Sequence, residues 1–339
     1  MPRIVECVPN FSEGRKIRTI NAIAGAISAV SGVKFISAEP DKDYNRTVVT
    51  FVGEPGAVLE GAFQGTRKAA ELIDMRTHQG EHPRIGATDV VPFVPVAGVT
   101  MAECVGLAKE FGARVASELQ IPVYLYEEAA TKPERRNLAT IRKGEYEGLA
   151  AKLADPEWAP DFGPSVFNAA SGATVAGARM FLIAYNVNLD TGDVRIASEI
   201  ALRIRESGRV KKDAGGNPVL DAQGKKITVP GSLRAVKAMG VLLEAHNIAQ
   251  VSINLVNYHV TPPHVAFEAV KQEAATLGAQ VTGSEIVGLT PKEALLMAGR
   301  FYAPEARGDD ALVDAAVRAL GLSQLEPFDI QKKVIEAQL

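Results

Sequence analysis

The chain is 339 residues long, more than twice the length of an average domain, so its length predicts two structural units. Hydrophobic residues make up 47% of it, charged residues 23%, and the net charge of −3 excludes the basic excess that nucleic-acid binding needs. No apolar run approaches the ~18 residues of a membrane span, and the N-terminal segment lacks the apolar core of a signal peptide. We therefore expect a cytoplasmic protein that binds neither nucleic acid nor membrane.

Hydrophobic periodicity predicts the order β-α-β-β-α-β in the first half, followed by extra helices. The expected strands are 4–8, 33–38, 47–52 and 90–94, and the expected helices are 16–30, 57–73, 101–118 and 135–143. The same order returns in the second half. Its expected strands are 181–188, 236–243, 249–256 and 280–287, and its expected helices are 194–205, 264–277, 291–301 and 309–320.

This order is typical of the ferredoxin-like unit, an open sheet with helices on one face, and it leaves the other sheet face in need of cover. We therefore expect an α/β (α+β) fold of two ferredoxin-like subdomains whose sheets face each other, with the helices outside. The expected subdomains are 1–179 and 180–327, and a tail helix is expected over 328–339.

Two stretches lack a clear period. Residues 155–179 are rich in Pro, Gly, Ala and Ser but carry Trp158 and Phe162, which favours a binding loop over a disordered linker. Residues 211–226 contain turn signals and are expected to form an exposed hairpin. Cys7 and Cys104 lie in apolar segments and are expected to be buried, reduced thiols.

The stretch MRTHQGEHPRIGATDVVPF, residues 75–93, contains a formal H-x-x-E-H zinc pattern. Such a pattern needs His78 and His82 on one helix, whereas Gly80 weakens a helix and Pro83 pushes the residue before it out of the helical region. We expect the preceding helix to end near Thr77, with Gly80 as a left-handed C-cap. His82 then lies at a bend.

A histidine beside a carboxylate before a proline suits proton transfer near neutral pH. The sequence favours this reading of His82 over a bland polar turn, and both over zinc. A second polar group, Glu39, Asp41 and Asp43 followed by Asn45 and Arg46, is either a solvated turn or the wall of a substrate site.

Seven collinear motifs carry a family resemblance that runs from Ile4 to about Phe328. They are VECVPNFSEG, NRTVVTFVGEP, GEHPRIGATDVVPFVPV, PVYLYEEAA, IRKGEYEGL, WAPDFGP and GATVAGARMFLIAYNVNL. Together they resemble glutamate formiminotransferase, which in mammals is the N-terminal part of formiminotransferase-cyclodeaminase.

The resemblance implies transfer of the formimino group of N-formimino-L-glutamate to tetrahydrofolate, a co-substrate, by a homodimer in histidine degradation. No metal is expected, because Gly80 and Pro83 deny His78 and His82 a shared helix face. It also implies two α/β subdomains joined over a folate tunnel, and it places the family's catalytic histidine on His82. Glu39 or Asp41 is expected to assist His82, and Arg46 or Arg84 to bind carboxylates of the donor. The implied folate segment consists of Gly163, Pro164, Ser165, Val166, Phe167, Asn168, Ala169, Ala170, Ser171 and Gly172.

Three alternatives stay open on the sequence alone. The same fold could move formyl between N-formylglutamate and 5-formyltetrahydrofolate, since the donor group differs only in N versus O. A folate-binding protein without turnover is the second alternative, and a zinc hydrolase is the third.

Overall fold

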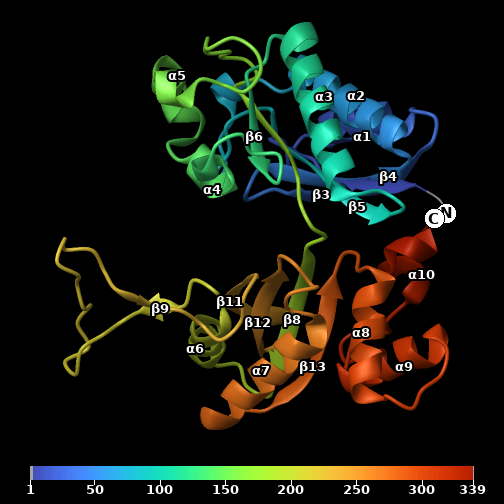
Figure 1. The fold of residues 1–339 in the computed structure, drawn as a ribbon, viewed down its shortest axis with the longest axis vertical. Coiled ribbons are helices and arrows are strands. Elements are labelled where there is room, and N and C mark those ends of the chain that lie inside the picture. Colours follow the sequence, from blue (N-terminus) through green and yellow to red (C-terminus); the bar gives the residue numbers. More distant parts are fainter. Residues whose placement is uncertain (1–2, 339) are drawn as a thin grey trace. The chain divides into compact units, whose positions relative to one another are not determined.

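The computed structural model describes residues 3–338. The chain divides into two compact units, Met1–Met180 and Phe181–Leu339, and sequence analysis had expected the boundary at residue 179. Each unit contains a sheet with helices, so two α/β subdomains are confirmed (Figure 1). That the two sheets face each other stays a prediction.

Unit 1 is built on a seven-stranded sheet. Its strands are β1 (Ile4–Cys7), β2 (Asn10–Phe11), β3 (Val33–Asp41), β4 (Arg46–Gly53), β5 (Thr88–Ala97), β6 (Val123–Glu127) and β7 (Thr174–Ala178). The antiparallel pairs β3–β4, β4–β1 and β1–β5 form the expected β-α-β-β-α-β core. Beyond β5 the sheet continues in parallel through β7 to β6, which the sequence did not predict.

Helices α1 (Ile17–Ser28), α2 (Pro55–Leu72) and α3 (Met101–Leu119) pack on one face of this sheet. The main core lies between them, where Val91 and Phe93 of β5 meet Phe63 and Phe111 of the helices. Local sequence fixes the helix starts, because a proline opens α2 and a capping box, in which Thr100 and Glu103 exchange hydrogen bonds, opens α3.

A smaller apolar cluster lies on the opposite face of the sheet. Val90, Tyr124 and Tyr126, which alternate with core residues along their strands, pack there against α4 (Leu138–Arg142) and α5 (Glu145–Ala154). Three 3-10 turns complete unit 1, and their bounds are η1 (Met75–Thr77), η2 (Pro133–Arg135) and η3 (Pro156–Trp158). The helix expected over 135–143 is present but shorter: a 3-10 turn precedes α4, which ends at Arg142.

Unit 2 has a four-stranded antiparallel sheet in the order β11-β12-β8-β13, which is the ferredoxin-like order. Its strands are β8 (Ile183–Leu189), β11 (Val236–Leu243), β12 (Ile248–Leu255) and β13 (Val281–Val287). The helices and 3-10 turns are α6 (Val194–Ile204), η4 (Glu244–His246), α7 (Pro263–Thr276), α8 (Lys292–Tyr302), α9 (Asp309–Ala319), α10 (Ile330–Lys333) and η5 (Ile335–Gln338). The expected tail helix is thus a short α-helix followed by a 3-10 turn.

A long arm leaves unit 2 between α6 and β11 (Figure 1). Strands β9 (Arg209–Val210) and β10 (Thr228–Val229) pair at its base, which confirms the expected hairpin. Asp213 and Asp221 each close a turn further out, where one carboxylate oxygen accepts hydrogen bonds from two backbone N–H groups. The arm is therefore ordered by its own turns.

The expectation of two buried thiols is confirmed, because Cys7 and Cys104 are both buried and free. Burial raises the pKa of Cys104 to about 12. No helix within residues 3–338 combines the length and apolar character that crossing a membrane requires.

Candidate functional site

The segment that carries His78 and His82 is irregular. Helix α2 ends at Leu72, five residues before the expected end at Thr77, and one 3-10 turn follows before His78, which is extended. The expected left-handed cap at Gly80 was wrong. Gly80 is needed instead for close approach, since a Cβ there would lie 2.3 Å from the carbonyl oxygen of Tyr44. The expectation that His78 and His82 do not share a helix is confirmed.

His82 is held against Arg46, the first residue of β4. Arg46 Nη1 lies 2.8 Å from His82 Nε2 and also donates to Asn10 Oδ1 at 3.0 Å. The Tyr44 ring lies 5.7 Å from the imidazole, centroid to centroid. Burial, then the charges of Arg46 and Arg142, lower the pKa of His82 to about 4. The imidazole is therefore neutral at physiological pH, and its Nδ1 is buried without a hydrogen-bond partner.

A second arginine reaches the same place from α4. Arg142 forms an ion pair with the buried Asp89 of β5, and Asp89 also accepts a hydrogen bond from the backbone N–H of Ile85 at 3.0 Å. Burial, followed by repulsion from Arg142, lowers the pKa of Arg46. The charges of two guanidinium groups and one carboxylate thus act on a neutral imidazole. The sequence did not predict Asp89 and Arg142 as site residues, because no sequence pattern links two residues that lie 53 positions apart.

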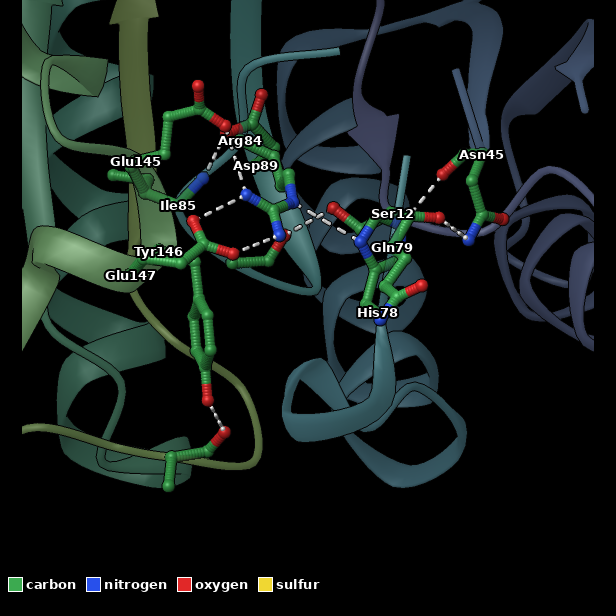
Figure 2. A network of polar contacts seen from close by, with 12 residues as sticks. Ser12, Asn45, His78, Gln79, Arg84, Ile85, Asp89, Glu145, Tyr146 and Glu147 are labelled. Atoms are coloured by element: carbon green, nitrogen blue, oxygen red, sulfur yellow. Dashed lines mark hydrogen bonds and ion pairs between the residues drawn. The ribbon is translucent and has the colours of Figure 1, made fainter. Parts of the chain in front are cut away.

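Arg84 lies in a neighbouring network, drawn in Figure 2. Its Nη atoms donate to Glu147 at 2.6 and 2.8 Å and to Glu145 at 3.0 Å, while Nε donates to His78 Nδ1 at 3.3 Å. Arg84, which the sequence predicted to bind a carboxylate of the donor, is therefore already paired with the carboxylates of Glu145 and Glu147. His78 Nε2 lies 2.9 Å from the carbonyl oxygen of Asn45, so both of its ring nitrogens have partners.

The two candidate assisting carboxylates have local partners. Glu39 accepts a hydrogen bond from the hydroxyl of Ser37 at 3.1 Å. Asp41 accepts from the backbone N–H groups of Asp43 and Tyr44, both at 2.9 Å, and so closes the turn before β4. Assistance to His82 from Glu39 or Asp41 stays a prediction.

The segment Gly163–Gly172 is a loop whose end is tied to the chain on either side of the histidine segment. Its residues Ala170 and Ser171 accept hydrogen bonds from the backbone N–H groups of Met75 and Ala87, both at 2.9 Å. Gly172 forms a bridge with Gly86. Further back, Val166 is 66% exposed and Phe167 packs on the ring of Tyr146. The loop thus combines an anchored end with an exposed centre.

Two cavities flank the junction of α4 and α5, and both belong to unit 1. The larger, about 550 Å³, is lined by Pro83, Ala139, Thr140, Arg142, Lys143, Gly144 and Glu145. The smaller, about 400 Å³, is lined by Gln79, Gly80, Arg84, Gly144, Glu145 and Glu147. Volumes of this size suit a small-molecule substrate. A search of the described part of the chain finds no group of three or more His, Cys, Asp or Glu side chains arranged to hold a metal ion.

Comparisons with known proteins agree over the whole chain. Residues 4–179 match the family model described as "Formiminotransferase domain, N-terminal subdomain", and residues 184–339 match "Formiminotransferase domain". A formimidoyltransferase-cyclodeaminase of Rattus norvegicus is 48% identical over 99% of this chain, which spans only 60% of that relative's length.

Shorter relatives are matched along nearly their full length. A glutamate formimidoyltransferase of Streptococcus pyogenes serotype M1 is 41% identical over 100% of this chain and 99% of its own. One from Thermoplasma acidophilum is 46% identical over 88% of this chain and 92% of its own.

Proposed function

The chain belongs to the formiminotransferase family, and from that premise we propose that it is a glutamate formimidoyltransferase. It transfers the formimino group of N-formimino-L-glutamate to tetrahydrofolate and yields 5-formiminotetrahydrofolate and L-glutamate. The observation that carries the proposal is the neutral imidazole of His82, which contacts the guanidinium of Arg46, feels the charge of Arg142 and lies next to Pro83, a residue that lines a cavity of about 550 Å³.

The reaction needs one group that accepts and then returns a proton. When folate N5 attacks the formimino carbon, an N–C bond forms, and N5 must lose its proton. When the bond from that carbon to the glutamate nitrogen breaks, the nitrogen must gain a proton. A neutral histidine can do both in turn, and such catalysis contributes ~10²–10⁴-fold. The lowered pKa of His82 supports this role, because it keeps the imidazole in the neutral form that a proton acceptor needs.

The folate site is proposed at Gly163–Gly172. Its support is the exposed centre of the loop, together with the hydrogen bonds that fasten its end beside the histidine segment. Val166→Trp tests this site, since an exposed side chain can be enlarged without disturbing packing. We expect the Kd for tetrahydrofolate to rise at least ~10-fold. Leu220→Trp, on the arm and 53% exposed, is the matched control.

The activity is tested by incubating the protein with tetrahydrofolate and each of two donors, formiminoglutamate and N-formylglutamate. Formation of 5-formiminotetrahydrofolate, followed by its absorbance, is the expected result. Transfer from N-formylglutamate alone would assign the chain to formyl transfer. Equilibrium binding of folate without transfer from either donor would leave a folate-binding protein.

The assembly and the compartment belong to the same proposal. The homodimer rests on the family resemblance, and the cytoplasmic location rests on the lack of a signal-peptide pattern in the sequence. Light scattering of the purified chain measures the first, and a mass near twice 36.0 kDa is expected.

A further inference from the structure

The contact between Arg46 and His82 determines which ring nitrogen carries the proton. A guanidinium has only donors, so His82 Nε2, 2.8 Å from Arg46 Nη1, must accept. In the neutral ring the proton then lies on Nδ1, which is buried without a partner. The one lone pair with which His82 could take a proton from folate therefore points at Arg46. In the free protein the base is blocked.

Arg46 is half-buried, and its hydrogen-bond acceptors carry no charge. Its hydrogen bonds go to two uncharged acceptors, the amide oxygen of Asn10 and the imidazole, and its Nε is buried without a partner. Arg142 adds a second positive charge close by, and its Nε also lacks a partner. Asp89 forms an ion pair with Arg142, and Asp89 and Asp41 act on Arg46 through their charges without a hydrogen bond to it. A carboxylate entering here would be a far stronger acceptor for Arg46 than an imidazole is.

Resting on the proposed function, we propose that Arg46 is a positioning residue that caps His82 Nε2 in the free protein and leaves it for a carboxylate of the donor. Donor binding thus frees the base. The proton of folate N5 then passes to Nε2, giving an imidazolium, and from Nε2 to the departing glutamate nitrogen. Nδ1 keeps its proton throughout, so the histidine ends the cycle as it began.

The groups that bear on the titration of His82 are Arg46 from β4, Arg142 from α4, Asp89 from β5 and the backbone carbonyl of Pro83, and the ring of Tyr44 packs against the imidazole. Asp41, at the end of β3, bears on Arg46. Of the two arginines, Arg46 is the one that hydrogen-bonds to the ring, so its withdrawal removes the nearest positive charge. The freed imidazole must therefore bind protons more tightly than the capped one.

The test uses the whole chain labelled with ¹⁵N-histidine. The chain has five histidines, and the signals of His82 are assigned by their loss in His82→Gln. The probes are glutarate, which carries the donor's two carboxylates, and glutaramide, its uncharged analogue. In the free protein we expect an unprotonated Nε2. Glutarate should shift the Nε2 resonance and raise the pKa of His82 by about a unit, and glutaramide should do neither.

Substitutions test whether Arg46 causes the response of His82 to glutarate. In Arg46→Gln we expect a weaker glutarate affinity by ~10-fold or more, a raised pKa of His82 without ligand, and little further rise with glutarate. Arg46→Lys keeps the charge and should restore part of the affinity. Arg3→Gln, an exposed arginine of the same unit paired with Glu103, is the control and should behave as wild type. If Arg46→Gln does not fold, the two probes on the wild-type chain still decide.

Three results would overturn the inference: a proton on Nε2 in the free protein, glutarate that does not bind, or glutarate that binds with no change at His82. These results are separate from failure of the proposed function. Transfer activity with an unresponsive His82 removes only the role of Arg46. A responsive His82 without transfer from any donor removes the proposed activity and leaves the carboxylate site.

Discussion

A substitution at Gly172 should damage the fold, contrary to what its place in an irregular loop indicates. The backbone of Gly172 has a φ of +68°, and a Cβ there would lie 2.1 Å from the carbonyl oxygen of Ile85. Alanine at such a φ costs ~1–2 kcal/mol. Relief of the overlap must open the bridge to Gly86, with backbone hydrogen bonds such as those of Ala87 and Ala173. At ~1 kcal/mol each, the total for Gly172→Ala is ~3–4 kcal/mol.

Gly216→Ala is the matched control, because Gly216 has a φ of +82° but nothing within 4 Å of the added Cβ. We expect it to cost only the ~1–2 kcal/mol of the backbone conformation. Urea unfolding of both variants measures the difference, and hydrogen exchange of the Ala87 and Ala173 amides localises it. Equal losses in the two variants, with unchanged exchange, would refute the close contact. The same variant is unsuitable for testing folate binding, since a weakened fold and a lost contact would look alike.

Four further outcomes are expected. His82→Gln should lower kcat by ~10²-fold or more and leave the Kd for tetrahydrofolate within about twofold, and a variant that keeps over half of kcat contradicts the shuttle. Since the folded-state pKa of His82 is about 4 against an ordinary 6.5, its neutral form contributes stability above pH 6.5 that is lost as the pH falls toward 4. Discounted for the partial exposure of His82, this contribution to the free energy of unfolding is ~1 kcal/mol. Urea unfolding of wild type and His82→Gln at pH 7 and pH 4.5 measures it. A difference in stability between the two proteins that does not change with pH contradicts the prediction. Arg135→Met should cost ~3–5 kcal/mol, because it leaves buried Asp161 without the guanidinium 2.8 Å away, whereas exposed Arg136→Met should cost under ~0.5 kcal/mol. Transfer should survive a chelator, since His78 and His82 share no helix face, and activity restored only by zinc would contradict this.

The sequence predicted most of the elements of both ferredoxin-like cores, because strands such as β4 and β8 alternate buried and half-buried residues and the helices carry apolar stripes. It missed β6 and β7 for a physical reason. All five residues of β7 are buried, as are the first four of β6, so neither strand shows the alternation that marks a half-buried strand. The small residues of β7 also gave it the composition of a loop.

At the site, local chemistry was readable and long-range pairing was not. Pro83 alone sufficed to place His82 outside a helix. Arg46 was foreseen as a candidate, yet its contact with His82 depends on how β4 meets the turn 36 residues later. Arg84 was assigned to the donor because its partners, Glu145 and Glu147, follow only 61 and 63 residues on. The fold brings such pairs together, and the spacing of the residues along the sequence does not predict them.

Because of the arm between β9 and β10, unit 2 should tolerate a cut in its chain without falling apart. Lys211, Lys212, Lys225 and Lys226 are exposed along it, so a trypsin-like protease should cut there first. The cut would separate β8 in the chain from β11, β12 and β13. Yet β8 is the inner strand that hydrogen-bonds to both β12 and β13. The two pieces should therefore stay together after cleavage, and two separately expressed fragments divided in the arm should reassemble into one folded unit.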